Sequence, residues 1–261
     1  MKKKLIIFDM DGTIYLGDYL FPYALEVFNY LNKNNIQYVF FTNNSSHDLD
    51  FYENKIKKFG IQCDKDNFYS STEVTINFLK EKGIKTIFAL ANSSLKNKLS
   101  KHFEIVPKYD ENAKIEAVVA GFNTELVYED LKNACLYLET RDVPFVATNG
   151  DYRCPVEDGL YIPDCGGMIE WMRLVTGKKA QVMGKPDPIC LYDLMKKYNV
   201  SKDEVLVVGD RLYTDILVGV NAGVDTLAVL SGEINMDEIN QSPYKPTYIR
   251  DSIKDLIELL K

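Results

Sequence analysis

Short runs of apolar residues recur along the chain, and each ends in polar or small side chains. The first covers residues 5–8, and equally apolar runs occupy 38–41 and 205–208. Runs this short, rich in β-branched and aromatic residues, are typical of strands buried on both faces of a parallel sheet. Further predicted strands cover residues 86–91, 116–120, 145–148 and 226–230.

Helical periodicity fills the intervals between these runs. Apolar residues recur at i, i+3, i+4 and i+7 over 24–31, and similar stripes occupy 127–138, 191–198 and 253–260. The alternation of strands and helices predicts an α/β fold with a parallel sheet. The stretch 149–167 has no clear periodicity, which predicts an irregular segment, either a functional loop or a mobile surface loop.

Composition narrows the class of protein. The chain has 261 residues, of which 46% are hydrophobic and 26% charged, and a net charge of −7. This fits a soluble globular protein of one large or two smaller domains. The acidic balance argues against a nucleic acid polymer or a membrane as partner, but not against a small phosphate bound through a cation. The absence of a long apolar run and the five widely spaced cysteines favour a cytoplasmic protein with reduced thiols.

Two carboxylates stand directly after the first apolar run. Asp9 and Asp11 are two residues apart, so on a strand they share one side while Met10 turns into the core. Like charges this close repel each other unless a cation lies between them. A hard cation such as Mg²⁺, which takes oxygen ligands, is the natural partner. The plainer interpretation is a surface turn, since Asp-Gly is common turn chemistry.

The second apolar run ends in Thr42, Asn43 and Asn44. Phosphate sites are often built this way, because backbone N–H groups and side-chain donors converge at the carboxyl end of a strand. The same residues could also serve only to cap the helix that follows.

Two later segments carry further candidate site residues. Lys185 stands between a glycine and a proline at the end of a predicted strand, although most lysines are solvated surface charges. The run 205–208 is followed by Asp210, with Asp215 five residues further on. All four polar segments follow predicted strands, and open α/β sheets bind their ligands at that edge.

In order and residue type, these four segments resemble the four motifs of the haloacid dehalogenase superfamily, most of whose members are phosphohydrolases. The resemblance covers the whole chain. It implies that Asp9 is the nucleophile, which becomes an aspartyl phosphate, and that Asp11 is the general acid/base. The remaining roles that it implies are phosphate binding by Thr42, Asn43, Asn44 and Lys185, Mg²⁺ binding by Asp9, Asp11 (through its main-chain carbonyl) and Asp210, and direct or indirect support of the metal by Asp215.

The long insertion between Thr42 and Lys185 resembles the branch with an α/β cap, which includes NagD-type phosphatases and 4-nitrophenylphosphatases. The predicted architecture is a Rossmann-like parallel-sheet core of residues 1–77 and 181–261 with an inserted cap of residues 78–180. In this branch the cap selects the substrate. The candidate selecting residues are Asp151, Tyr152, Arg153 and Asp164, although Gly150 stands where many relatives have proline.

The function implied is Mg²⁺-dependent hydrolysis of small phosphorylated metabolites, such as nucleotide, sugar or other organic phosphates, with p-nitrophenyl phosphate as an artificial substrate. Asp11 favours ester hydrolysis, because dehalogenase-type members lack this acid. A phosphomutase or other phosphotransferase would also keep it. A non-catalytic phosphate-binding protein would lack at least one motif residue, and none is missing. We expect a monomer or homodimer.

Overall fold

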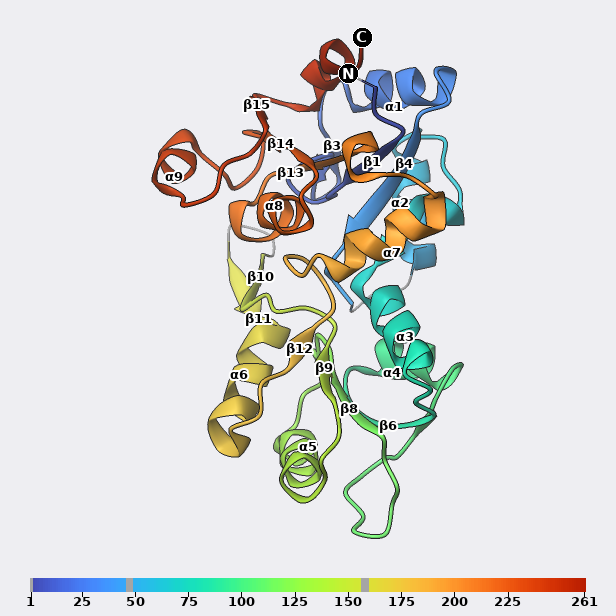
Figure 1. The fold of residues 1–261 in the computed structure, drawn as a ribbon, viewed down its shortest axis with the longest axis vertical. Coiled ribbons are helices and arrows are strands. Elements are labelled where there is room, and N and C mark those ends of the chain that lie inside the picture. The colour runs from blue at the N-terminus through green and yellow to red at the C-terminus, as the bar shows by residue number, and fades with distance from the viewer. Residues whose placement is uncertain (1, 46–48, 156–159) are drawn as a thin grey trace. The chain divides into compact units, whose positions relative to one another are not determined.

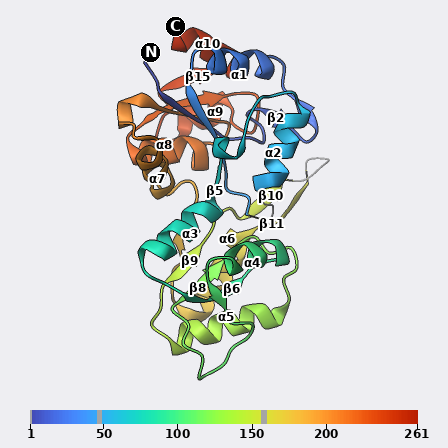
Figure 2. The same cartoon turned by 90° about the vertical axis from the view of Figure 1, so that its right-hand side faces the viewer.

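The computed structural model describes residues 2–45, 49–155 and 160–261. The chain divides into two compact units (Figures 1 and 2). The first unit comprises Met1–Thr42, Leu49–Tyr69 and Lys185–Lys261, and the second comprises Asn43–Asp48 and Ser70–Gly184. Each contains a sheet with parallel pairings and flanking helices, which confirms the predicted α/β class.

The first unit is built on a sheet whose strand order is β15-β14-β13-β1-β4-β5 in the described part of the chain. The pairings from β15 to β4 are parallel. Helices α1 and α10 lie on one side of this sheet, and α7 and α8 lie on the other (Figures 1 and 2). The elements are β1 (Leu5–Phe8), β2 (Tyr15–Leu16), β3 (Tyr19–Leu20), α1 (Ala24–Lys33), β4 (Gln37–Thr42), α2 (Leu49–Lys58), β5 (Phe68–Ser70), α7 (Ile189–Tyr198), β13 (Val205–Gly209), α8 (Leu217–Ala222), β14 (Asp225–Val229), α9 (Met236–Gln241), β15 (Tyr248–Arg250) and α10 (Leu256–Leu260).

The position of β1 determines where the site forms. All four residues of β1 are buried, and it lies between β4 and β13. Phe8, the last residue of β1, pairs with Phe40 of β4 and with Val208 of β13, so the carboxyl ends of the three parallel strands lie at one edge of the sheet. The polar residues that follow these strands are therefore brought to one edge of the sheet, as open α/β sheets require for ligand binding.

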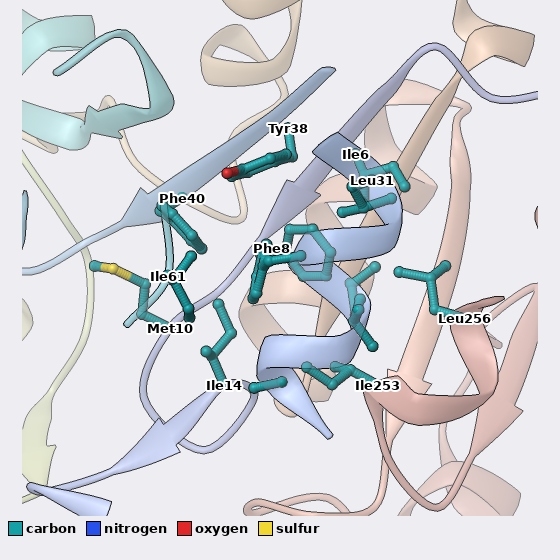
Figure 3. Packing of buried hydrophobic residues seen from close by; sticks show 14 of the residues in the cluster. Ile6, Phe8, Met10, Ile14, Leu31, Tyr38, Phe40, Ile61, Ile253 and Leu256 are labelled. Carbon is teal, nitrogen blue, oxygen red and sulfur yellow. The ribbon is translucent and has the colours of Figure 1, made fainter. Parts of the chain in front are cut away.

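The core of the first unit forms between this sheet and α1. The four residues of the predicted stripe, Ala24, Val27, Phe28 and Leu31, are all buried. The Phe28 ring lies 5.1 Å from the rings of Phe8 and Phe40, a separation at which tilted aromatic rings attract each other. Figure 3 shows this cluster, into which Met10 also turns, as its place between two carboxylates predicted. On either side of Gly17, β2 and β3 pair antiparallel as a short hairpin.

The second unit is built on a parallel sheet with the order β12-β9-β8-β6-β7 in the described residues. Helices α5 and α6 pack on one face, and α3 and α4 lie on the other side (Figure 1). The elements are α3 (Ser71–Glu81), β6 (Thr86–Leu90), α4 (Ser93–Ser100), β7 (Glu104–Ile105), β8 (Ala117–Ala120), α5 (Tyr128–Thr140), β9 (Phe145–Ala147), β10 (Arg153–Pro155), β11 (Tyr161–Pro163), α6 (Cys165–Thr176) and β12 (Gln181–Val182).

Two sequence-based predictions for the second unit are wrong. Val127 does not belong to the buried stripe of α5, because it precedes the helix and is 57% exposed. The segment 149–167 is not irregular where the structure describes it, because β10 and β11 pair antiparallel and α6 begins at Cys165; residues 156–159 lie outside the described residues. The residues of β11 are exposed, so no buried face imposed the alternation of apolar and polar residues that marks a strand in sequence.

The extent of the second unit also differs from the expected cap of residues 78–180. Its main segment spans Ser70–Gly184. Helix α3 runs without interruption from Ser71 to Glu81, with a capping box at Ser70, so a boundary at residue 78 would divide one helix.

The described residues contain no helix with the length and apolar character needed to cross a membrane.

Candidate active site

Lys185 lies at the centre of the site in the first unit. Its Nζ is 2.5 Å from Oδ1 of Asp9 and 2.7 Å from Oδ1 of Asp215, and it donates to the carbonyl oxygen of Phe41 at 3.3 Å. Burial alone would lower the pKa of this lysine, but the carboxylates of Asp215 and Asp9 raise it above its ordinary value. The ammonium group is therefore charged at any physiological pH. Because the side chain is only 4% exposed, Lys185 is not a solvated surface charge.

Three carboxylates converge beside this ammonium group. Asp9, Asp210 and Asp215 each offer an oxygen, and these atoms all lie within 4.8 Å of one another. Burial, followed by repulsion from Asp215, raises the pKa of Asp9 well above its usual range and that of Asp210 to about 6. A group of hard oxygen donors that repel one another is chemically suited to a divalent cation such as Mg²⁺.

Asp210 is held by partners from other segments. Thr13 Oγ1 donates to its Oδ1 at 3.0 Å, and the N–H of Glu233 donates to its Oδ2 at 2.9 Å. Gly12 lies against the same carboxylate, where a Cβ would come within 2.3 Å of Oδ2, and its φ of +86° also favours glycine. The Asp-x-Asp-Gly-Thr segment thus approaches Asp210 closely, and it is not an isolated surface turn.

Asp11 lies apart from the three clustered carboxylates. Its side chain reaches solvent, yet protein atoms surround it closely enough that desolvation raises the pKa of its carboxyl above the ordinary value, while Lys55 opposes the shift. The Tyr15 hydroxyl donates to its Oδ2 at 3.4 Å, a long hydrogen bond. The Lys55 ammonium lies 4.1 Å from the centre of the Tyr15 ring. A solvent-reaching carboxyl with a raised pKa is suited to proton transfer.

The segment Thr42–Asn44 is divided between the two units. Thr42 ends β4 in the first unit and is buried, whereas Asn43 and Asn44 belong to the second. The side-chain Nδ2 of Asn43 donates to Oδ2 of Asp151 at 2.9 Å, and the main-chain carbonyl oxygen of Asn43 accepts a hydrogen bond from Ser71 Oγ at 3.0 Å. Within the second unit, Asn43 therefore has structural partners of its own. Asn44 is half-buried.

The four candidate selecting residues differ in their surroundings. Asp164 is buried and caps α6, accepting hydrogen bonds from the N–H of Cys165 at 2.5 Å and from Asn149 Nδ2 at 3.0 Å. Asp151 accepts from the same Asn149 amide at 3.1 Å.

The other two candidates reach solvent. Tyr152 is 66% exposed, and the exposed Arg153 guanidinium lies 4.1 Å from the centre of the Tyr161 ring. Of the four candidates, only Tyr152 and Arg153 therefore have exposed side chains.

Sequence reasoning missed the segment 231–234, which follows β14. Ser231 Oγ donates to the carbonyl oxygen of Gly12 at 3.0 Å, and the N–H of Ile234 donates to the carbonyl oxygen of Asp210 at 2.9 Å. The segment could have been recognised from its position in the sequence, because it follows a predicted strand. That strand, β14, is parallel to β13, so both end at the edge of the sheet where Asp210 lies.

Protein-family models and known proteins that resemble this chain agree with one another. The model of the haloacid dehalogenase-like hydrolases matches residues 6–102, and a HAD-hydrolase-like model matches residues 182–256. The acid sugar phosphatase of Staphylococcus saprophyticus is 32% identical over 259 residues, which cover 99% of this chain and 97% of that protein.

Solved structures agree over the whole chain. A 4-nitrophenylphosphatase from Thermotoga maritima superposes with a TM-score of 0.91 at 35% identity, covering 100% of this chain and 98% of that one. NagD from E. coli K-12 gives a TM-score of 0.88 at 27% identity, covering 98% of both chains. The matched models include the strand ends that carry Asp9, Lys185 and Asp210. The chain therefore belongs to the family of haloacid dehalogenase-like hydrolases.

Proposed function

We propose that this protein is a Mg²⁺-dependent phosphatase that hydrolyses small phosphorylated metabolites through an aspartyl-phosphate intermediate. The observation that carries the proposal is the pairing of Asp9 with the buried Lys185 ammonium, next to the carboxylate of Asp210. A nucleophilic carboxylate must approach a phosphate of the same charge, and this arrangement supplies positive charge where the two anions meet.

Each carboxylate has a distinct proposed role. Asp9 attacks phosphorus in line, which divides one difficult hydrolysis into two easier steps. Asp11 gives a proton to the leaving alkoxide and then takes one from the water that cleaves the intermediate, a contribution of about 10²–10⁴ in rate. Thr42, Asn43, Asn44 and Lys185 are the proposed partners of the phosphoryl oxygens.

Mg²⁺ would be held by the carboxylates of Asp9 and Asp210 and by the main-chain carbonyl of Asp11. The bound ion would neutralise part of the negative charge of the phosphate. Asp215 is the weaker candidate ligand, because its Oδ1 pairs with Lys185 at 2.7 Å and its Oδ2 accepts from the N–H of Arg211 at 3.1 Å. We therefore assign Asp215 to orienting Lys185.

The proposed substrates are small organic phosphates, sugar phosphates among them. Support comes from the relatives, which are named acid sugar phosphatase and 4-nitrophenylphosphatase. We propose that the second unit selects the substrate through Asp151, Tyr152, Arg153 and Asp164, with Tyr152 and Arg153 as the residues free to contact a leaving group. A cytoplasmic location is consistent with the five cysteines, which form no disulfide in the described part of the chain.

The test is phosphate release from p-nitrophenyl phosphate with Mg²⁺, with EDTA, and by the Asp9→Asn variant. We expect turnover only in the first case, because an amide is neither a nucleophile nor a good Mg²⁺ ligand. Asp142→Asn is the matched control, since the side chain of Asp142 is fully exposed. Activity of Asp9→Asn within tenfold of wild type would refute the assignment, and transfer of phosphate to an added sugar instead of water would favour the phosphotransferase alternative.

A further inference from the structure

We propose that the segment 231–234 and the ion pair between Arg211 and Glu233 hold the Asp210 carboxylate in its metal-binding orientation. Glu233 would then be a positioning residue that acts on the metal through Asp210. This inference rests on the metal site proposed above. Apart from Arg211, which follows Asp210 directly, the residues concerned come after β14 and belong to none of the four motifs.

The main chain of this segment encloses Asp210 on two sides. The N–H of Glu233 donates to Oδ2 of Asp210, and the N–H of Ile234 donates to its carbonyl oxygen, both at 2.9 Å. Gly232 lies so close that a Cβ would come within 2.0 Å of Oδ2. No side chain fits between this segment and the Asp210 carboxylate, so the position of the segment determines the position of the carboxylate.

The ion pair between Arg211 and Glu233 links the same two segments through their side chains. Nε and Nη2 of Arg211 each lie 2.9 Å from Oε1 of Glu233. The side chain of Arg211 is 19% exposed and that of Glu233 is 32% exposed. Arg211 follows Asp210 directly in the chain, so the pair joins the two segments already linked by main-chain hydrogen bonds. Ser231 extends the connection to the loop after β1 by donating to the carbonyl oxygen of Gly12 at 3.0 Å.

Such a connection matters because the clustered carboxylates repel one another. Without external partners, the Asp210 carboxylate would lower the repulsion by rotating away from Asp9 and Asp215, and a metal would have to reverse that rotation on binding. Groups that hold metal ligands in place typically contribute 10- to 100-fold to metal affinity. We therefore assign Arg211 and Glu233 this role, with Glu233 supplying the acceptor that keeps Arg211 in position.

The experiment is titration of Mg²⁺ into the purified full-length protein by calorimetry, comparing Glu233→Ala with Glu233→Gln. We expect the alanine variant to bind Mg²⁺ about tenfold more weakly or worse. The glutamine variant loses the charge but keeps an oxygen that accepts from Arg211, so its affinity should stay near that of wild type. Equal losses in both variants would overturn the inference, because they would show that only the negative charge of Glu233 matters.

Arg211→Ala separates the two explanations by the sign of its effect. Removing a positive charge beside the site should by itself tighten the binding of a cation. Loss of the connection to Glu233 should weaken it instead. Weaker Mg²⁺ binding by Arg211→Ala supports the inference, whereas tighter binding contradicts it.

Gly232→Ala gives an independent steric test. We expect its Cβ to displace the Asp210 carboxylate and abolish measurable Mg²⁺ binding. The matched control is Gly167→Ala on α6, where a Cβ meets nothing within 4 Å. If Gly232→Ala fails to fold, as judged by circular dichroism, the Glu233 and Arg211 variants still decide the question.

Two further outcomes separate this inference from the proposed function. Failure of the wild-type protein to bind Mg²⁺ would refute the metal site itself, and this inference with it. Normal Mg²⁺ binding by wild type, together with dissociation constants within twofold of it for Glu233→Ala and Arg211→Ala, would refute the inference alone. Turnover of Glu233→Ala should return towards the wild-type rate at saturating Mg²⁺, since only the affinity is lost.

Discussion

Lys185 and Asp215 form an ion pair of 2.7 Å in which the two side chains are only 4% and 1% exposed. The cost of removing two charges from water cancels much of their attraction, so the net contribution of a buried ion pair to stability is small. Loss of one partner has a large effect, however, because it leaves the other charge buried and uncompensated. The site is therefore coupled to the stability of the whole first unit.

Lys185→Met should lower the free energy of unfolding by about 3–5 kcal/mol, since it leaves both Asp9 and Asp215 without their cation. Urea unfolding monitored by circular dichroism measures this. Lys65→Met is the control, because Lys65 pairs with Asp50 on the surface at 69% and 59% exposure and should lose less than about 1 kcal/mol. Equal effects of the two substitutions would contradict the prediction.

Asp11→Asn should retain Mg²⁺ binding and lose about 10² or more in kcat, because the amide cannot protonate a leaving group. The loss should be larger for an alkyl phosphate than for p-nitrophenyl phosphate, whose leaving group needs little protonation. Steady-state kinetics with both esters measures the difference. Unchanged turnover of the alkyl phosphate would remove Asp11 from the role of general acid.

The stability of the metal-free protein should depend on pH through Asp210. Burial and Asp215 raise the pKa of Asp210 to about 6 in the folded protein, above the value of an unfolded chain. Between these two pKa values the folded protein binds the proton more readily, so this contribution to stability is complete at low pH and is lost as pH rises through about 6.

Urea unfolding in EDTA at pH 4 to 7.5 tests this, with Asp210→Asn as the comparison. The difference in unfolding free energy, wild type minus variant, should fall as pH increases. A difference that grows with pH would mean that the folded protein favours the ionised carboxylate even without metal.

Substrate selection should depend on Tyr152 and Arg153. Alanine at these two positions, alone or together with Asp151→Ala, should change kcat/KM for the preferred metabolite far more than for p-nitrophenyl phosphate, which offers few groups to recognise. Because Asp151 also accepts a hydrogen bond from Asn43, the single variants separate selection from this structural contact. Equal losses for both substrates would show that these residues shape the site without selecting the substrate.

The sequence was most informative where one physical constraint dominates. Strands buried on both faces allow only apolar residues, so β1, β4 and β13 were predicted almost to the residue, and parallel pairing then placed Asp9 and Asp210 at one edge. The stripe of α1 was equally clear, because one face of that helix is wholly buried.

Other features leave weaker traces in sequence. The exposed strand β11 carries no burial pattern, so the hairpin that it forms with β10 was read as a loop. Residues 231–234 bind Asp210 mainly through main-chain N–H groups, which every residue except proline provides. Only the absence of space for a Cβ at Gly232 constrains the residue type there, and a single glycine in a loop is too common to indicate a site.

The central place of β1 has a consequence for the order in which the protein can be completed during synthesis. Its neighbour β4 follows within the first 42 residues, but its other neighbour, β13, begins only at residue 205. Until then, one edge of β1 has no strand to pair with, and an open apolar edge is prone to wrong association. The whole of the second unit emerges from the ribosome during this interval, so it can fold before the first unit has its complete sheet.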